Sequence, residues 1–336
     1  MLASLVLLGM ALAMSGHLDS ARSVSATAPL GSLEQPVIPI EISGPLADRN
    51  SEVSGLDWYA DYLIILPQYP ERLGNHLFAL RKADILDALS AQRTAPLEPI
   101  PIPFFAPDFA SEIGGFEGFE AIAFKGNRAF ITIEAELNGA AKGYVVTGTL
   151  ASDLSQLAID SQRLAESPVQ STSPNKADES LIVAENQIIA IYEANGAQLN
   201  PSPSMHAFDF ELRPQPPVSF PNIEYRITDA TALDEQSHFW AINYFYPGDS
   251  DLLPARDPLA IRYGRGSTHR QQPTVERLVE FSYSQNGTTR TSTAPIQLEL
   301  AAASRNWEGI ARLDDKGFLL MTDKFPETIL GFVALP

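Results

Sequence analysis

The chain contains no cysteine among its 336 residues. Disulfide frameworks, thiolate zinc sites, iron–sulfur clusters and cysteine nucleophiles are therefore excluded. Histidine is also scarce, and its five residues show no HExxH or other paired spacing, which argues against a zinc site. The GxSxG, GxxxxGK[ST] and GxGxxG motifs are absent as well, so the usual serine esterase, nucleotide and dinucleotide sites find no support.

Basic residues are few. The chain has 23 Lys and Arg against 41 Asp and Glu, which gives a formal net charge of −18 and a pI near 4.6. A surface with this charge repels nucleic acid and anionic membranes and attracts metal cations and basic partners. Nucleic-acid binding is therefore set aside.

The apolar run Leu2–Met14 is too short to span a bilayer as a helix and fits the h-region of a secretory signal. We expect residues 1–26 to be a signal peptide, 27–35 a flexible tether and 36–336 the folded domain. No Lys or Arg precedes the run, which weakens the signal-peptide pattern. The prediction is a periplasmic or secreted protein with no membrane span in the mature chain.

One unit recurs five times along the chain. Two polar residues, fourteen or fifteen positions apart, frame two short apolar runs joined by a turn such as 125–127 (Lys-Gly-Asn). Each unit predicts a β-hairpin. The pairs are Ser54 with Gln68, Glu120 with Glu134, Glu179 with Glu193, Asp229 with Asn243, and Glu308 with Asp323.

Repeated β units of this length are typical of a β-propeller, so we predict an all-β fold with a single five-bladed propeller. A six-bladed ring is the alternative, with the extra blade inside the long fourth unit, which carries an insertion at Tyr244–Thr274. The last unit supplies three strands, whereas a blade has four. An N-terminal edge strand at Pro36–Ser43 is expected to complete that C-terminal blade and close the ring. A helix of about three turns is expected within Leu77–Gln92.

If the hairpins are the inner strands of the blades, equivalent positions face the same central channel. The leading residues would form one ring of polar side chains and their partners a second, with Glu52 on the same face. Seven carboxylates in one opening raise one another's pKa unless they are protonated, paired with a base or bridged by a cation. The bases nearest in sequence are Lys125, Lys176 and Lys324.

Oxygen ligands without His or Cys are what a hard cation such as Ca²⁺ prefers. We therefore predict a central Ca²⁺ site. In the alternative interpretation, the same side chains hydrogen-bond the neighbouring blade and line a wet channel that binds no metal. The predicted ligands are Ser54, Glu120, Glu179, Asp229, Glu308 and Asp323.

Several of these segments resemble the bacterial esterase-like phytase family of propeller proteins. The matching segments are 51–58 (SEVSGLDW), 115–124 (GFEGFEAIAF), 177–183 (ADESLIV), 192–196 (YEANG), 243–249 (NYFYPGD), 275–279 (VERLV) and 305–323 (RNWEGIARLDDKGFLLMTD). The resemblance implies hydrolysis of esters or phosphoesters outside the cytoplasm. A looser likeness links the chain to five-bladed calcium-dependent apyrases, which carry acid-led strands around a central ion.

Two functional hypotheses follow. The first is an extracytoplasmic Ca²⁺-dependent phosphoester hydrolase for a small anionic substrate, with Glu134 or Glu193 as general base and Lys324 as a phosphate contact. The second is a non-catalytic binding or scaffolding propeller, in which an ion only braces the blades and rim loops such as Tyr244–Thr274 dock a partner.

Overall fold

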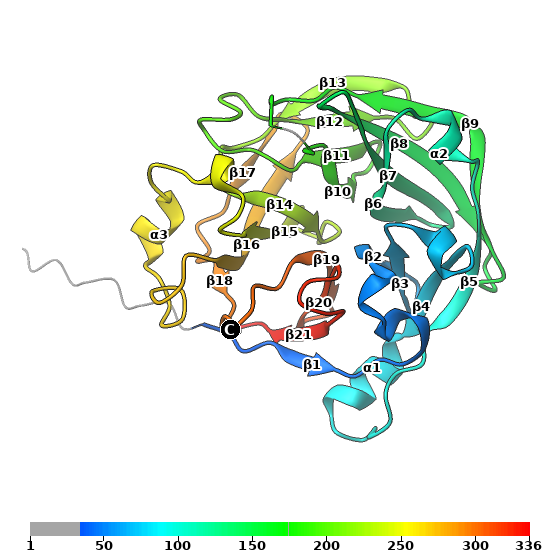
Figure 1. Ribbon diagram of the computed structural model, residues 1–336, viewed down its shortest axis with the longest axis horizontal. Helices are drawn as coiled ribbons and strands as arrows, with labels where there is room; N and C mark the ends of the chain where they lie inside the picture. The colour runs from blue at the N-terminus through cyan, green and yellow to red at the C-terminus, as the bar shows by residue number, and fades with distance from the viewer. Residues whose placement is uncertain (1–33, 174) are drawn as a thin grey trace, which may run out of the picture.

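The computed structural model describes residues 34–173 and 175–336, and β-strands dominate this part of the chain. The sheets are arranged around a central axis in the manner of a β-propeller (Figure 1). This agrees with the predicted all-β class. The predicted signal peptide and residues 27–33 of the predicted tether lie outside the described residues. In the described ranges, no helix has the length and apolar character needed to cross a membrane.

The first two hairpin units of the sequence form one eight-stranded sheet. Its two halves are antiparallel meanders, and a parallel contact of Phe104 and Phe105 with Leu157 and Ala158 joins them. The strands of the first half are β2 (Val53–Tyr59), β3 (Tyr62–Pro67), β4 (His76–Arg81) and β5 (Ile100–Phe105). Those of the second half are β6 (Phe116–Lys125), β7 (Arg128–Leu137), β8 (Ala140–Leu150) and β9 (Leu157–Ser167).

The third and fourth units each form a sheet of their own. The third consists of β10 (Asp178–Val183), β11 (Ile188–Tyr192), β12 (Ser204–Phe208) and β13 (Pro214–Ser219). The fourth consists of β14 (Arg226–Ala230), β15 (His238–Phe245), β16 (Val275–Ser284) and β17 (Gly287–Arg290), and β18 (Ile296–Gln297) also pairs with β16.

The last sheet joins the two ends of the chain. It contains β19 (Trp307–Leu313), β20 (Gly317–Thr322) and β21 (Leu330–Ala334). The N-terminal strand β1 (Ile38–Ile40) pairs antiparallel with β21, which confirms the predicted closure. On either side of β1, Gln35 bridges to Leu298 and Ile42 to Leu97, so residues 34–43 contact three successive sheets.

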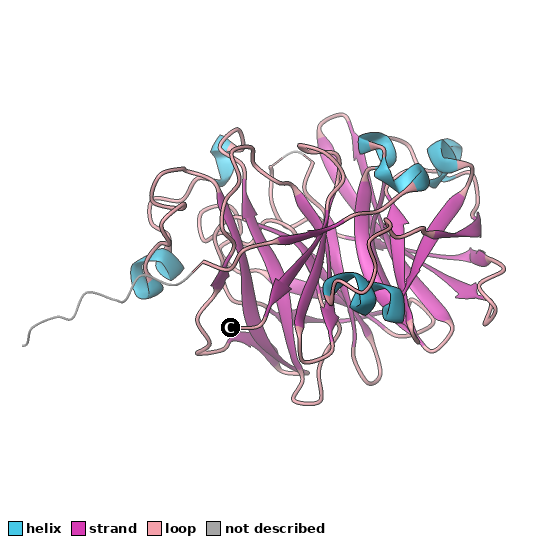
Figure 2. Ribbon diagram, turned by 90° about the horizontal axis from the view of Figure 1, so that it is seen from below, coloured by secondary structure: helices cyan, strands magenta, loops and turns pink. Residues whose placement is uncertain are grey.

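Helices are short and lie outside the sheets (Figure 2). The predicted helix within Leu77–Gln92 is shorter than expected. Its first residues form β4, because four consecutive apolar side chains, 77–80, are buried in the sheet. The α-helices are α1 (Lys82–Leu89), α2 (Phe109–Glu112) and α3 (Pro258–Tyr263), and the 3₁₀ helices are η1 (Gly44–Ala47), η2 (Arg49–Ser51), η3 (Pro70–Leu73) and η4 (Ser250–Leu252).

The first strands of the five hairpins form a closed ring. Strand β2 contacts β6, β6 contacts β10, β10 contacts β14, β14 contacts β19, and β19 contacts β2 again. Apolar side chains fill the space between neighbouring sheets. One such cluster combines Leu63 of β3 and Leu80 of β4 with Leu319 and Met321 of β20.

Each inner strand has a β-bulge at the polar residue that leads the sequence repeat. The strand register shifts at Ser54, Glu120–Ala121, Glu179, Thr228–Asp229 and Glu308. A bulged residue leaves the regular alternation of the strand, so its side chain can be redirected. The recurring polar residue of the sequence is therefore a recurring bulge in the structure.

The position after each leading polar residue is small: Gly55, Ala121, Ser180, Ala230 and Gly309. At the two glycines a side chain has no room, because neighbouring inner strands approach closely. A Cβ atom on Gly55 would lie 3.1 Å from the Cα of Ala121, and one on Gly309 would lie 2.7 Å from the Cγ of Leu56.

Replacing Gly309 by Ala is expected to lower the free energy of unfolding by about 1–3 kcal/mol, because the added methyl group overpacks the contact between β19 and β2. The measurement is urea unfolding followed by fluorescence. Gly114→Ala is the matched control, since its Cβ would meet its nearest atom, in Leu137, at 3.7 Å. Equal stability of the two variants would contradict the close packing of the ring.

Candidate functional site

Five glutamates and one arginine lie together where the inner strands meet. We call this group the central cluster: Glu120, Glu134, Glu179, Glu193, Arg226 and Glu308. All five glutamates are buried. They come from β6, β7, β10, β19 and the end of β11, so strands of separate sheets bring them together, as the sequence predicted.

Arg226 supplies the main positive charge of the central cluster. Its Nε donates to Glu193, and its Nη2 lies 3.1 Å from Glu308 Oε1 and 3.5 Å from Glu179 Oε2. Nη1 donates to Asn306 Oδ1 at 3.3 Å. Sequence reasoning missed this residue. The available signal was period-2 alternation, which places Arg226 on the same face of β14 as Thr228.

Of the three bases that the sequence indicated, one reaches the central cluster. The ammonium of Lys176 lies 3.5 Å from Glu193 Oε2. Lys125 instead donates to the carbonyl of Glu185, and Lys324 lies 3.2 Å from Glu52 Oε1. Glu52 also accepts a 2.9 Å bond from Arg72, so it belongs to a separate ion-pair group.

The central cluster holds protons at neutral pH. Burial, reinforced by the charge of Glu193, raises the pKa of Glu134 to about 8, although Lys176 and Arg226 oppose the rise. Burial likewise raises the pKa of Glu308 to about 8 against the attraction of Arg226. Burial and a neighbouring carboxylate raise the pKa of Glu120 and of Glu179 well above the ordinary range. Protonation and pairing both relieve the repulsion that the sequence predicted.

Ser54, a predicted metal ligand, is hydrogen-bonded to the neighbouring inner strand. Its hydroxyl donates to the carbonyl of Phe119 at 2.6 Å, and Thr228 donates in the same way to the carbonyl of Trp307 at 2.6 Å. Each of these carbonyls precedes the glutamate of the next inner strand. Thr228 is therefore the counterpart of Ser54 in the fourth unit, a position that the sequence analysis gave to Asp229.

Asp229 connects two sheets. Its oxygens accept the backbone N–H groups of Ile310 and Ala230, both at 2.8 Å. Asp57 does the same for Phe124 and its own neighbour Trp58, and burial raises its pKa to about 7. Both aspartates thus hold neighbouring inner strands together, which is the backbone role that the alternative interpretation foresaw.

The remaining side chains of the predicted second ring do not all lie in the central cluster. Gln68 Nε2 donates to Glu120 Oε1 at 2.9 Å and so extends the central cluster. Asn243 binds the backbone carbonyl of Arg226. Asp323 accepts the N–H of Phe325 at 2.7 Å, and burial raises its pKa.

Two carboxylate oxygens of the central cluster, Glu134 Oε1 and Glu193 Oε2, are buried and accept no hydrogen bond from the described residues, although Glu193 Oε2 forms the 3.5 Å ion pair with Lys176. Their chemistry suits a hard cation. Within 34–173 and 175–336, however, no three acidic or histidine side chains are grouped as a ready metal site.

A cavity of about 380 Å³ is lined by Arg226 of the central cluster and by none of its glutamates. Tyr246 and Phe325, which are half-exposed, belong to its wall. Burial raises the pKa of Asp249, another wall residue, against the pull of Arg226 and Lys176. The lining is Arg226, Tyr244, Tyr246, Asp249, Ala303, Ser304, Asn306, Phe325 and Pro326.

No protein-family model and no curated protein sequence matches the chain. Among solved structures, it is similar to a putative glycoside hydrolase from Parabacteroides distasonis at 11% identity and a TM-score of 0.47, over 90% of this chain and 93% of that one. A glycosyl hydrolase from Bacteroides ovatus shares 12% identity with a TM-score of 0.48, over 91% and 94%. An α-L-arabinanase from Cellvibrio cellulosa shares 11% with a TM-score of 0.46, over 84% and 90%. At this level the likeness does not identify a reaction.

Stability is expected to fall as the pH rises from about 5 to 8. Over this range Glu134 and Glu308 keep their protons in the folded chain and release them in the unfolded chain. The free energy of unfolding therefore falls by about 1.4 kcal/mol per pH unit for each group. Glu134→Gln has no proton to lose, so its slope is expected to be shallower. Urea unfolding across this range measures the slope. Glu280→Gln, a change outside the central cluster, is the control and keeps the original slope; an unchanged slope in Glu134→Gln would refute the assignment.

Removing the guanidinium with Arg226→Met is expected to cost about 3–5 kcal/mol of stability, because buried carboxylates lose their partner. Arg226→Lys restores only part of this loss, since an ammonium lacks the planar fork that reaches several acceptors. The control is Arg213→Met, which removes a guanidinium that is 74% exposed and paired with Asp209. Thermal and urea unfolding give the comparison, and similar losses in the two Met variants would contradict the central role of Arg226.

Proposed function

We propose that the chain is an extracytoplasmic hydrolase and that the central cluster is its reaction centre. The proposal rests on one arrangement: Glu134 and Glu308, whose pKa burial raises to about 8, lie in the same buried group as Glu193, which pairs with Arg226 and Lys176. A carboxylic acid next to a carboxylate is the combination that acid–base hydrolysis uses.

The proposal assigns a role to each side chain. Glu134, with a pKa of about 8, is suited to donate a proton to the leaving group. This differs from the general-base role that the sequence analysis considered for it. Glu193 remains the candidate base for a water molecule. Arg226 holds Glu193 in place and lies in the wall of the 380 Å³ cavity, a volume that suits a small substrate.

The finer part of the proposal is a phosphoester substrate and dependence on Ca²⁺. The donor chemistry fits, because the central cluster offers buried carboxylate oxygens, and Glu134 Oε1 accepts no hydrogen bond from the part of the chain that the structure describes. We propose that Glu120 and Glu179, two of the predicted ligands, would hold the ion beside Glu134 and Glu193, which keep their roles as acid and base. A bound Ca²⁺ would supply the positive charge that a phosphate group needs among so many carboxylates.

We also propose that the chain is a five-bladed propeller. This count divides the eight-stranded sheet at its parallel β5–β9 contact into two blades, β2–β5 and β6–β9. The closed ring of five inner strands supports this division. The long fourth unit contributes one sheet, which speaks against a sixth blade there.

The second candidate is a non-catalytic scaffold. Arg226 directs its donors at Glu179, Glu193, Glu308 and Asn306, which fixes strands from three sheets to one another. With these contacts Arg226 would stabilise the ring of inner strands without taking part in a reaction. The two candidates predict different outcomes for the same variants.

The test is hydrolysis of p-nitrophenyl phosphate, phytate and ATP, with Ca²⁺ and then with excess EDTA. Glu193→Gln and Glu134→Gln are expected to lower kcat by about 10²–10⁴-fold. Circular dichroism checks that the fold is intact, and Glu280→Gln should retain full activity. Turnover that survives EDTA removes the metal from the proposal. No turnover of any substrate by a folded, Ca²⁺-loaded chain favours the scaffold.

A further inference from the structure

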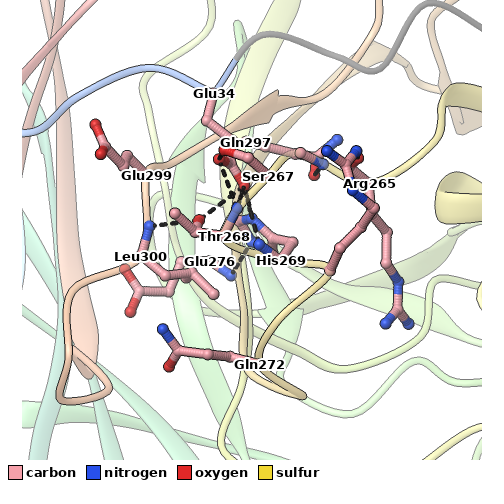
Figure 3. Close-up of polar contacts among 12 residues, drawn as sticks. Glu34, Arg265, Ser267, Thr268, His269, Gln272, Glu276, Gln297, Glu299 and Leu300 are labelled. Carbon is pink, nitrogen blue, oxygen red and sulfur yellow. Dashed lines mark hydrogen bonds and ion pairs between the residues drawn. The ribbon is translucent and has the colours of Figure 1, made fainter.

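The N-terminal end of the described chain is bound by a loop of the fourth unit (Figure 3). The carboxylate of Glu34 accepts hydrogen bonds from the hydroxyls of Ser267 at 2.9 Å and Thr268 at 2.8 Å. It also accepts the backbone N–H groups of Thr268 and His269, both at 3.0 Å, and His269 Nδ1 at 2.7 Å. Five donors therefore surround one carboxylate, whose side chain is 5% exposed.

The loop is shaped to admit a carboxylate. We call residues 265–270 the receptor loop. A Cβ atom on Gly266 would lie 2.2 Å from the carboxyl group of Glu34, so a glycine is required for the close approach. The N–H of Gly266 is held by Gln297 Oε1 at 2.9 Å.

The donors of the receptor loop are oriented by contacts on their far side. His269 Nε2 accepts the backbone N–H of Glu276 at 3.2 Å, so the ring hydrogen resides on Nδ1 and points at Glu34. Thr268 Oγ1 accepts the N–H of Leu300 at 2.9 Å and therefore directs its own hydrogen at the carboxylate. This arrangement keeps neutral donors in place whatever occupies the site.

Hydrogen bonds set the electrostatics of the receptor loop. Exposed Arg262, Arg265 and Arg270 lie in and beside it, and buried Glu276 lies next to His269. Burial alone would raise the pKa of Glu34, but the donors from Thr268 and His269 lower it to about 2. A local field of this kind favours an anion.

We propose that the receptor loop is a binding site for carboxylate ligands and that Glu34 is its tethered, exchangeable occupant. The bound segment shows the mode of recognition. Beside Glu34, the N–H of Gln35 donates to the carbonyl of Gln297, and the N–H of Glu299 donates to the carbonyl of Gln35, both at 2.8 Å. A glutamate in an extended peptide therefore fits the site, by side-chain capture combined with strand pairing.

The test is chemical rescue in the full chain. Glu34→Ala removes a CH₂–COO⁻ group, which acetate replaces. The melting temperature of Glu34→Ala is expected to be lower than that of the original chain and to rise saturably with millimolar acetate. Acetamide and chloride at equal concentration provide the controls for shape and ionic strength. The original chain, whose site is filled, is expected not to respond.

A second set of variants keeps the proposal open to refutation if Glu34→Ala does not fold. Glu34→Gln keeps the shape of the side chain, and acetate is expected to displace the amide with saturable NMR shifts of the Thr268 and His269 amides. Adding Ser267→Ala and Thr268→Val to either variant removes two of the five donors and is expected to weaken acetate binding. The proposal is overturned if acetate produces no saturable effect, or if it stabilises the original chain equally. A tetraglutamate peptide that binds about tenfold more tightly than acetate would identify acidic peptides as ligands, and equal binding would identify small carboxylates.

Discussion

Closure of the ring forces several carboxylates into a space that one guanidinium has to neutralise. The inner strands approach so closely that the position after each leading polar residue is occupied by Gly, Ala or Ser. The polar side chains at the bulges then have few directions to point in, and burial strengthens every interaction among them. Arg226 and the protons on the glutamates together make this concentration of acid tolerable. The packing of the whole ring thus depends on how its centre is charged.

The same constraint links structure to the proposed chemistry. A carboxyl group that is protonated because it is crowded and buried can give up its proton when a neighbour's charge changes. A substrate or cation entering beside Arg226 would alter those charges. The crowding of buried carboxyl groups lowers the stability of the ring, and the same crowding would prepare a proton for transfer in the proposed reaction.

The repeat, the strand pairing that closes the ring and the gathering of glutamates could be predicted from the sequence, because each depends on local alternation and spacing. The position of Thr228 could not, since a bulge shifts the pattern by one residue and the acidic Asp229 next to it fits the repeat better by composition. Arg226 was missed because it precedes the repeat and has no equivalent in the other units. The parallel contact between β5 and β9 joins strands that are distant in sequence, so no local sequence pattern predicts it. The helix was overestimated because Leu77 and its neighbours satisfy helical and strand patterns alike.

The N-terminal strand β1 has a consequence for the order in which the chain folds. Its partner β21 follows all the other strands of the ring in the sequence, so the last sheet cannot be completed until those strands have been synthesised. Contacts of such high sequence separation form late, because the entropy of closing the longest possible loop opposes them. Until then β21 presents an unpaired edge that can pair with another chain. Pairing with β1 covers that edge and completes the ring, so the N-terminal strand protects the last sheet from association.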